Sequence, residues 1–243
     1  MGTTSAPQAE QQRPSRHFSD RTFQSAPISA ESKRAIPHEF MSDVQAATID
    51  AGLSGKDLLV QAKTGTGKTM AFLLPAIERL AKVAQPPRGV SILVLAPTRE
   101  LALQIEQEAL VLLKHHTHMT VGHVMGGTNN RTSLNTILRN PPTILVATPG
   151  RLYDHLTTPE YASAVQAQFR GLRTLVYDEA DRLLDQGFKR ELDGILRALP
   201  DRHVSPRQVM LYSATISKDI REVRFESAFA FRLTLCERLR NKH

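Results

Sequence analysis

The chain has 243 residues, of which 41% are hydrophobic and 23% charged, a composition that allows a sizeable buried core in an ordinary globular protein. The longest apolar runs, such as residues 89–96, are too short to cross a bilayer, which excludes a transmembrane protein. The single cysteine, Cys236, excludes an internal disulfide framework and a cysteine-based zinc site and favours a reducing, intracellular compartment, while the net charge of +7 favours polyanionic partners.

Residues 1–17 form a lead whose composition differs from the rest of the chain. They are rich in glutamine, proline and serine and show no amphipathic period, which predicts disorder. Arg13, Arg16 and Arg21 leave a mitochondrial transit peptide open, although the prolines and the scarcity of apolar residues argue against an amphipathic helix here. Further along, Pro37 predicts that any helix before residue 40 is short.

From residue 40 onward, short apolar runs alternate with helical patterns. The apolar runs predict strands at residues 57–61, 91–95, 121–125, 143–146, 174–177 and 208–212. Helical periodicity predicts helices at residues 69–83, 99–114, 131–138, 189–199 and 216–223. Nearly all-apolar strands that alternate with helices indicate one α/β domain, built on a mostly parallel sheet with helices on both faces.

Residues 62–69, Ala-Lys-Thr-Gly-Thr-Gly-Lys-Thr, follow the first of these strands and lead into a helix, which is the context that a P-loop needs. Glycines allow backbone N–H groups to converge on a phosphate, and the helix N-terminus adds its positive end. Lys68 is expected to neutralise phosphate charge and Thr69 to ligate Mg²⁺, with a chance glycine-rich turn as the alternative. The residues predicted to bind a nucleotide in this loop are Ala62, Thr64, Gly65, Thr66, Gly67, Lys68 and Thr69.

Two carboxylates follow the apolar strand predicted at residues 174–177. Asp178 is expected to face the magnesium ion, and Glu179 beside it could polarise an attacking water. Together with Lys68, these carboxylates are the predicted catalytic residues. The alternative is that they only cap the N-terminus of a helix, a position that Asp and Glu often take.

Six segments stand in the order of the motifs of the DEAD-box ATP-dependent RNA helicases, which the chain resembles. Motifs I, Ia, GG, Ib, II and III are matched by residues 62–69, 97–102, 126–127, 148–151, 178–181 and 213–215, and the Q-motif glutamine by Gln45. The resemblance covers about residues 18–235. It implies the N-terminal one of the family's two RecA-like domains, a P-loop domain that binds ATP and Mg²⁺ and hydrolyses ATP to drive local separation of RNA duplexes.

The resemblance also implies roles for individual positions. Gln45 would read the adenine edge of ATP, and Phe18, or alternatively Phe23, would stack on the adenine ring. The residues implied in sequence-independent contact with the RNA backbone are Pro97, Thr98, Arg99, Gly126, Gly127, Thr148, Pro149, Gly150 and Arg151. Those implied in coupling motif II to RNA binding and domain closure are Asp181, Ser213 and Thr215.

The match to the family departs from its pattern at two places. Residues 38–44 lack the Gly-Phe and Thr-Pro pairs that usually precede the Q-motif glutamine. Nothing after Thr215 resembles the second RecA-like domain with its arginine fingers, although residues 228–235 alternate as a strand would. We therefore predict one RecA-like domain over residues 18–236, with residues 237–243 as a tail, native or not, or as the start of an interdomain linker. We also predict a monomer whose partner, the second RecA-like domain, is absent from this chain.

Some features support rival interpretations. His115, His116 and His118 could suggest a metal site, but no carboxylate or cysteine accompanies them nearby and they close a helical run. Two functional alternatives stay open: a non-catalytic ATP- and RNA-binding module of the same fold, and a P-loop NTPase that acts on DNA or protein. The Asp-Glu-Ala-Asp tetrad, together with the arginines of motifs Ia and Ib, favours RNA as the substrate over DNA or protein.

Overall fold

The computed structural model describes residues 18–84 and 88–216. Its centre is a six-stranded sheet in the order β3-β8-β7-β4-β6-β5, in which every neighbouring pair is parallel. The strands are β3 (Leu58–Gln61), β4 (Ile92–Leu95), β5 (Val121–Val124), β6 (Ile144–Ala147), β7 (Thr174–Tyr177) and β8 (Gln208–Ser213). All of them lie where the sequence predicted strands, and the predicted α/β fold class is confirmed.

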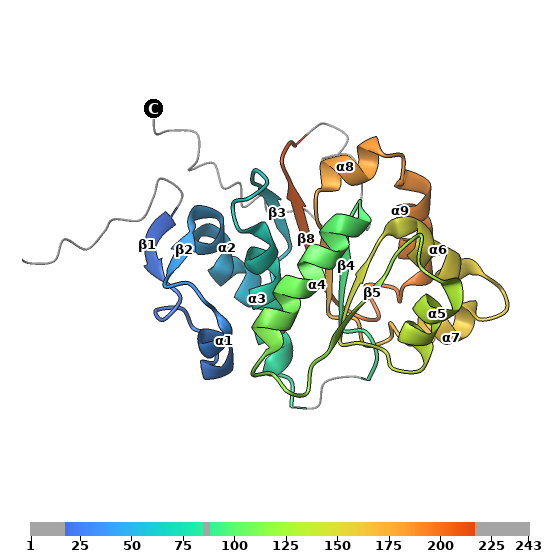
Figure 1. Ribbon diagram of the computed structural model, residues 1–243, viewed down its shortest axis with the longest axis horizontal. Coiled ribbons are helices and arrows are strands. Elements are labelled where there is room, and N and C mark those ends of the chain that lie inside the picture. Colours follow the sequence, from blue (N-terminus) through green and yellow to red (C-terminus); the bar gives the residue numbers. More distant parts are fainter. Residues whose placement is uncertain (1–17, 85–87, 217–243) are drawn as a thin grey trace, which may run out of the picture.

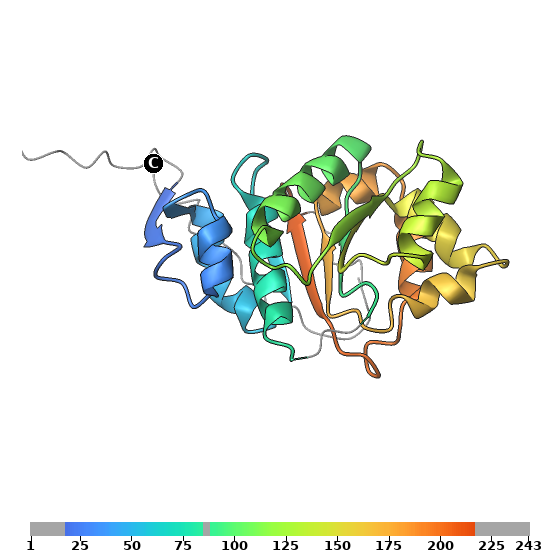
Figure 2. The same ribbon diagram turned by 60° about the horizontal axis from the view of Figure 1, so that its bottom comes forward.

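Helices cover both faces of this sheet (Figures 1 and 2). They are α3 (Lys68–Ala81), α4 (Arg99–Leu113), α5 (Asn130–Leu138), α6 (Pro149–Thr157), α7 (Ala162–Ala167), α8 (Ala180–Asp185) and α9 (Lys189–Ala198). Helices α3, α4, α5 and α9 begin and end within about two residues of the predicted helices. The sequence did not predict α6, α7 and α8.

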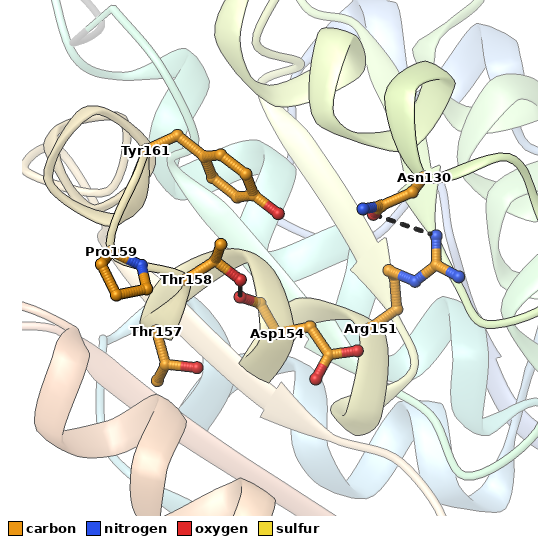
Figure 3. Close-up of a pocket in the computed structure, with 7 residues that line it drawn as sticks. All are labelled: Asn130, Arg151, Asp154, Thr157, Thr158, Pro159 and Tyr161. Atoms are coloured by element: carbon orange, nitrogen blue, oxygen red, sulfur yellow. Dashed lines mark hydrogen bonds between the residues drawn. The ribbon is translucent and has the colours of Figure 1, made fainter.

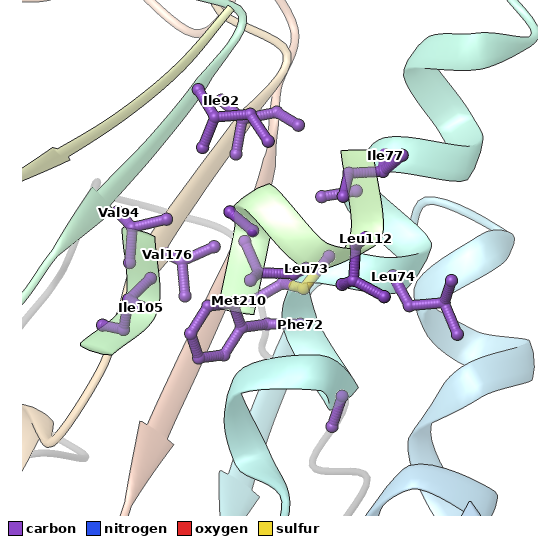
Figure 4. Close-up of a cluster of buried hydrophobic side chains, with 14 of the residues drawn as sticks. Phe72, Leu73, Leu74, Ile77, Ile92, Val94, Ile105, Leu112, Val176 and Met210 are labelled. Carbon is purple, nitrogen blue, oxygen red and sulfur yellow. The ribbon is translucent and has the colours of Figure 1, made fainter. Parts of the chain in front are cut away.

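Each strand contributes to two hydrophobic clusters, because successive side chains of a strand point to opposite faces. In β4, Ile92 and Val94 join side chains of α3 and α4, whereas Leu93 and Leu95 join side chains of α6, α8 and α9. Figure 4 shows the first of these clusters, in which Phe72 of α3 lies among side chains of α4 and the sheet. The strands β4, β6 and β7 are buried along their whole length, as is typical of parallel strands covered on both faces, whereas the edge strand β5 is mostly half-buried.

Residues 18–53 form an N-terminal segment that precedes the first strand of the large sheet. Within it β1 (Phe18–Thr22) pairs antiparallel with β2 (Phe40–Ser42), and α1 (Ala30–Ala35) and α2 (Asp43–Leu53) accompany the strands. The segment lies at one end of the molecule beside α3 (Figure 1). The sequence did not predict these strands, but α1 is short and ends ahead of Pro37, as expected.

A buried polar cluster fastens the N-terminal segment to the rest of the domain. The Glu78 carboxylate of α3 accepts hydrogen bonds from Ser29 N–H at 2.8 Å, from Ser29 Oγ at 2.5 Å and from Ser32 Oγ at 2.6 Å. Ser32 Oγ also lies 2.9 Å from His116 Nε2. Burial lowers the pKa of His116, although the charge of Glu78 opposes this effect. His116 thus has a structural role, and the described residues contain no group of three or more His, Cys, Asp or Glu side chains placed to hold a metal ion.

Several predictions fall outside the described residues. These are the disordered lead, the strand at residues 228–235, the tail at residues 237–243, and all but Ile216 of the helix at residues 216–223. The predicted domain end at residue 236 therefore stays a prediction. Among the helices of residues 18–84 and 88–216, none has the length and apolar character that a membrane span requires.

Candidate active site

The sheet gathers the predicted motifs at one edge. Because its strands are parallel, the loops after their carboxyl ends open on the same side, where open α/β sheets bind ligands. Motif I follows β3, motif III begins at the last residue of β8 and motif II follows β7, and these three strands are neighbours. Motifs Ia, Ib and GG follow β4, β6 and β5, which are neighbours in the other half of the sheet. The edge thus has a half predicted to bind phosphates (the phosphate half, motifs I, II and III) and a half predicted to bind RNA (the RNA half, motifs Ia, Ib and GG), which meet where β7 pairs with β4.

Motif I forms the turn that a phosphate-binding loop requires. Gly67 has a φ of 84° and precedes α3, and an added Cβ would lie 2.6 Å from Gln45 Nε2, so only glycine fits here. Thr66 Oγ1 donates a hydrogen bond to the Lys63 carbonyl at 2.8 Å, which closes the turn. Since α3 begins at Lys68, its first backbone N–H groups are available to an anion at this loop.

Lys68 is a buried cation without an acceptor in the described part of the chain. The residue is 6% exposed, and its Nζ makes no hydrogen bond to any residue within 18–84 and 88–216. A buried ammonium without a hydrogen-bond acceptor is costly, even with the Asp178 carboxyl close enough to feel its charge, so the position is suited to an anionic ligand. The phosphates of a nucleotide fit this donor and the helix N-terminus beside it.

Asp178 is a buried carboxylate at the carboxyl end of β7, with 2% exposure. Burial raises the pKa of its carboxyl to about 6, against the opposing effects of the Lys68 charge and of Glu179 N–H, which donates to Asp178 Oδ1 at 3.0 Å. A divalent cation would favour the charged form of this group, and carboxylate and hydroxyl oxygens are ligands that Mg²⁺ accepts. Asp178 and the Thr69 hydroxyl therefore fit the predicted metal site.

Glu179 is held in a left-handed backbone conformation, with φ 48° and ψ 52°. It is the one non-glycine residue with positive φ in the described part of the chain. Such a conformation costs on the order of 1–3 kcal/mol and is concentrated at functional sites. Glu179 precedes α8, but its side chain makes no capping hydrogen bond and instead lies 3.2 Å from Arg182 Nη1. The simple capping alternative therefore lacks the contact that it requires.

Motifs II and III are joined by hydrogen bonds around Asp181. Its Oδ2 accepts from the N–H and the hydroxyl of Thr215, both at 3.0 Å, and its own N–H donates to Ser213 Oγ at 3.3 Å. Ser213 Oγ in turn donates to the Thr215 carbonyl at 2.6 Å. Burial alone would raise the pKa of Asp181, but the hydrogen bonds from Thr215 outweigh it and leave that pKa below its usual value. The three predicted coupling residues therefore form one connected group.

Gln45 connects the N-terminal segment to motif I. Its Oε1 accepts from Ser42 N–H at 2.8 Å, and Ser42 Oγ accepts from Gln45 N–H at 3.4 Å, a capping box at the start of α2. Its Nε2 donates to the Gly67 carbonyl at 3.1 Å. The amide is therefore already bonded on both sides, and its contact with adenine stays a prediction. Of the two stacking candidates, Phe18 is 44% exposed and Phe23 is 2% exposed in the core, so Phe18 has the accessible ring.

In the RNA half of the edge, motifs Ia and GG contact each other. Arg99 is exposed at the start of α4 and lies against Gly127, where φ is 76° and an added Cβ would clash with Arg99 Nη1. Thr98 caps α4 by accepting a hydrogen bond from Leu101 N–H at 3.3 Å. Pro97 is buried just before it. An exposed guanidinium and a close backbone approach are suited to a phosphodiester strand.

Motif Ib is tied to the GG loop by two hydrogen bonds. Thr148 Oγ1 accepts from Gly126 N–H at 3.2 Å, and Arg151 Nη1 donates to the Thr128 carbonyl at 3.1 Å. Pro149 is the buried first residue of α6, and an added Cβ at Gly150 would meet no other atom within 4 Å. The structure therefore brings the predicted RNA-binding residues together on one side of the domain.

Comparison with known proteins identifies the family. Residues 42–223 match the model of the family described as DEAD/DEAH box helicase. The chain belongs to this family. Among its relatives, the rice (Oryza sativa subsp. japonica) "DEAD-box ATP-dependent RNA helicase 26" is 45% identical over 211 residues, which cover 85% of this chain and 38% of that protein. The rice "DEAD-box ATP-dependent RNA helicase 25" is 44% identical over 216 residues, which cover 85% of this chain and 35% of that protein.

A solved structure of a DEAD/DEAH box helicase relative has the same fold. The crystal structure of a DEAD box protein from the hyperthermophile Methanococcus jannaschii matches with a TM-score of 0.74 and 27% identity, over 86% of this chain and 55% of that one. The chain spans about a third of the length of the two rice relatives.

Glu108 is a charged residue of this DEAD/DEAH box helicase domain that the sequence did not predict near the site. Burial raises the pKa of Glu108 on α4, although hydrogen bonds with Gln104 and Thr69 oppose the rise. The negative charge of Glu108 also raises the pKa of Asp178. Glu108 therefore adds a carboxylate beside the predicted metal site, from the helix that begins with motif Ia. No motif or spacing in the sequence singled it out.

Proposed function

We propose that this chain is the ATP- and RNA-binding first RecA-like domain of an ATP-dependent RNA helicase. ATP hydrolysis in the complete enzyme would drive local separation of RNA duplexes. The observation that carries the proposal is the order of the motifs along the sheet edge, since the phosphate half and the RNA half meet at the paired strands β7 and β4. The names of the relatives, which are ATP-dependent RNA helicases, favour RNA over DNA or protein as the substrate.

In the proposed reaction, this chain's residues bind the nucleotide and prepare the water. The unpaired Lys68 ammonium and the first N–H groups of α3 would hold the phosphates, and Thr69 and Asp178 would hold Mg²⁺. Bound there, Mg²⁺ would neutralise negative charge on the phosphates. Glu179 would accept a proton from the attacking water, in the position that its left-handed backbone fixes. Gln45 and the exposed Phe18 would recognise adenine.

RNA binding in this proposal is independent of base sequence. Arg99 and Arg151 would contact phosphates, together with the hydroxyl of Thr148 and the backbone at Gly127. Such a surface holds the strand without reading its bases. The group of hydrogen bonds around Asp181 would transmit the state of the nucleotide to motif III.

A second RecA-like domain is the partner that the proposal requires. It would complete the RNA cleft and supply an arginine finger, which in phosphoryl-transfer enzymes is worth about 10³–10⁵ in rate. We propose that the chain is monomeric by itself and meets this domain through a linker. An intracellular location, which the single cysteine favours, belongs to the same proposal.

Phosphate release from ATP tests the proposal. The 243-residue chain is measured alone and tethered to the second domain of a rice relative, each with RNA, with DNA and without polymer. We expect turnover near background for the chain alone and RNA-stimulated turnover for the tethered protein. If DNA stimulated turnover of the tethered protein, or if neither polymer did, the RNA assignment would be contradicted. RNA-stimulated turnover by the chain alone would contradict the need for a second domain and point to self-association.

A further inference from the structure

A hollow lies beside motif Ib, away from the nucleotide loop. It is a largely open depression with a volume of about 550 Å³. It is lined by Asn130, Arg151, Asp154, Thr157, Thr158, Pro159 and Tyr161 (Figure 3). Only Arg151 among these residues belongs to a motif that the sequence analysis recognised. The side chains of Tyr161 and Asn130 extend toward each other across the hollow (Figure 3).

A buried histidine holds two walls of this hollow in place. The His155 ring is fully buried and lies 5.9 Å, centre to centre, from the ring of Tyr161. Its Nε2 lies 2.7 Å from Ser133 Oγ, which also accepts a hydrogen bond from Arg151 Nη1 at 3.3 Å. Arg151 Nη1 additionally lies 3.4 Å from Asn130 Oδ1. The guanidinium and the aromatic ring are therefore positioned before any ligand arrives.

The connection that carries Tyr161 is equally well fixed. Thr158 Oγ1 donates to the Asp154 carbonyl at 2.6 Å, and Tyr161 N–H donates to the Thr158 carbonyl at 3.2 Å. Gln166 Nε2 donates to the Leu156 carbonyl at 2.9 Å. A ligand that binds to a site held in this way loses less free energy to ordering the protein.

The lining favours a nucleoside over a bare phosphate. The Asp154 carboxylate would repel a phosphate in the hollow, but it can accept a hydrogen bond from a ribose hydroxyl or a base amino group. The Asn130 amide can pair with a base edge, and Tyr161 offers a ring on which a base can stack. Arg151 both lines the hollow and belongs to motif Ib, where the RNA backbone is proposed to pass.

We propose that the hollow receives one nucleoside of the bound RNA strand, with its base stacked on Tyr161. The inference rests on the proposed function, because it requires an RNA backbone at motif Ib. It deepens that function by adding a base contact to the proposed backbone contacts. The base in the hollow would be separated from the stack formed by the other bases of the strand, close to motif Ib. Any base can stack, so this contact adds affinity at one position of the strand without a strict sequence preference.

A scan with abasic sites tests the proposal on the full 243-residue chain. The shortest single-stranded RNA that binds with full affinity, whose length leaves it one register on the protein, is made with one base removed at each position in turn, and affinities are measured by fluorescence anisotropy at low salt. For the unmodified protein we expect one position, or two adjacent ones, to lose about 5- to 100-fold in affinity. Tyr161→Ala should make the affinity independent of which base is removed, which is a flat scan. Tyr161→Phe should keep the position-specific loss because the ring remains. Leu110→Ala, an exposed change on α4, is the control that should leave the scan unchanged.

The outcomes separate this inference from the proposed function. A flat scan for the unmodified protein, with salt-dependent RNA binding intact, would overturn the hollow as a nucleoside site and leave the function standing. Absence of RNA binding by the unmodified protein would overturn both. Adenosine monophosphate binding that Tyr161→Ala removes, with a flat RNA scan, would assign the hollow to a free nucleotide and overturn the proposal.

A second measurement does not depend on the folding of any variant. Photo-activated cross-linking of RNA with 4-thiouridine at each position should attach one position to the peptide that contains Tyr161. That position should be the one at which base removal weakens binding. Cross-links to the Tyr161 peptide that come from other positions and not from that one would contradict the proposal.

Discussion

Asp181 and Thr215 lie in different motifs and are joined by two hydrogen bonds to one oxygen, from the Thr215 N–H and hydroxyl to Asp181 Oδ2, both at 3.0 Å. Asp181 belongs to α8, which directly follows Asp178 and Glu179, whereas Thr215 lies two residues beyond the end of β8. A shift of motif II therefore cannot leave motif III unaffected. This pair connects α8, beside the predicted catalytic carboxylates, to the residues that follow β8.

Thr215→Val should leave ATP binding intact while reducing RNA-stimulated ATP hydrolysis. The change keeps the side-chain shape and removes the hydroxyl bond to Asp181, which contributes about 0.5–1.5 kcal/mol. We expect ATP affinity to persist and RNA-stimulated turnover of the tethered protein to fall. A double-mutant cycle with Asp181→Asn, measured as stimulated turnover, should show non-additive losses. Additive losses would mean that the two residues act separately.

Lys68→Ala should weaken ATP binding by about 10- to 100-fold, because a charge-assisted phosphate contact is worth about 1.5–3 kcal/mol. The fold should persist, since Lys68 Nζ makes no hydrogen bond to the described residues. Titration with a fluorescent ATP analogue measures the loss. Lys63→Ala is the matched control, because Lys63 is exposed in the same loop. Equal effects of the two changes would show that only general charge is involved.

Glu179→Gln should preserve ATP binding and remove hydrolysis in the tethered protein. The amide keeps the size of the side chain but cannot accept a proton from water. Single-turnover hydrolysis and analogue titration distinguish the two effects. Asp185→Asn, an exposed change in the same helix, should alter neither. Parallel loss of binding and hydrolysis would instead make Glu179 a metal ligand or a structural residue.

Asp178→Asn should raise the stability of the ligand-free chain above pH 6. The pKa of about 6 in the folded state lies above the ordinary value of 3.8, so the folded state holds the proton more tightly than the unfolded state. Wild-type stability should therefore fall as the pH rises from about 4 through 6, by roughly 3 kcal/mol from this group. The asparagine variant has no charge to bury. Urea unfolding at pH 4 and pH 8 should show a difference only at pH 8, and an equal difference at both would contradict the cause given.

Arg99→Ala should weaken RNA binding about equally for all sequences and reduce the salt dependence. Each neutralised phosphate releases counterions, so the slope of log affinity against log salt should decrease by about 1. Anisotropy titrations over a range of salt concentrations measure it. Arg139→Ala is the matched control, since Arg139 is exposed at the end of α5 that lies away from the motifs. An unchanged slope for Arg99→Ala would place the RNA elsewhere.

The sheet was predictable because its strands are short, apolar and separated by helical periods, as at Ile92–Leu95. The N-terminal strands were not, since Phe18–Thr22 reads Phe-Ser-Asp-Arg-Thr and has no apolar run. Helix α2 does carry a local helix-start signal, because Ser42 and Gln45 have the spacing of a capping box. Helix α6 was concealed by the Pro149-Gly150 pair at its start, which favours a turn interpretation.

The candidate site divides in the same way. Lys68, Asp178 and Glu179 were predictable because their chemistry depends on contiguous motifs next to strands. Glu108 and Tyr161 were not, because each reaches its neighbours only through tertiary packing of a helix or loop. No local sequence pattern predicts that the His155 ring packs against the Tyr161 ring, or that the Glu108 carboxylate of α4 contacts Thr69.

The Glu78 carboxylate has a consequence for the smallest fragment that can fold. The family match begins at residue 42, yet two donors to this buried carboxylate, Ser29 and Ser32, come earlier in the chain. A fragment cut at the family boundary would lose both donors together with Phe23, Ile28 and Ile36, which are buried in the core, so the apolar side chains that they pack against would be exposed to water. The stable domain therefore starts upstream of the sequence by which the family is recognised, and expression fragments that begin at residue 42 would be destabilised by the core surface that they expose.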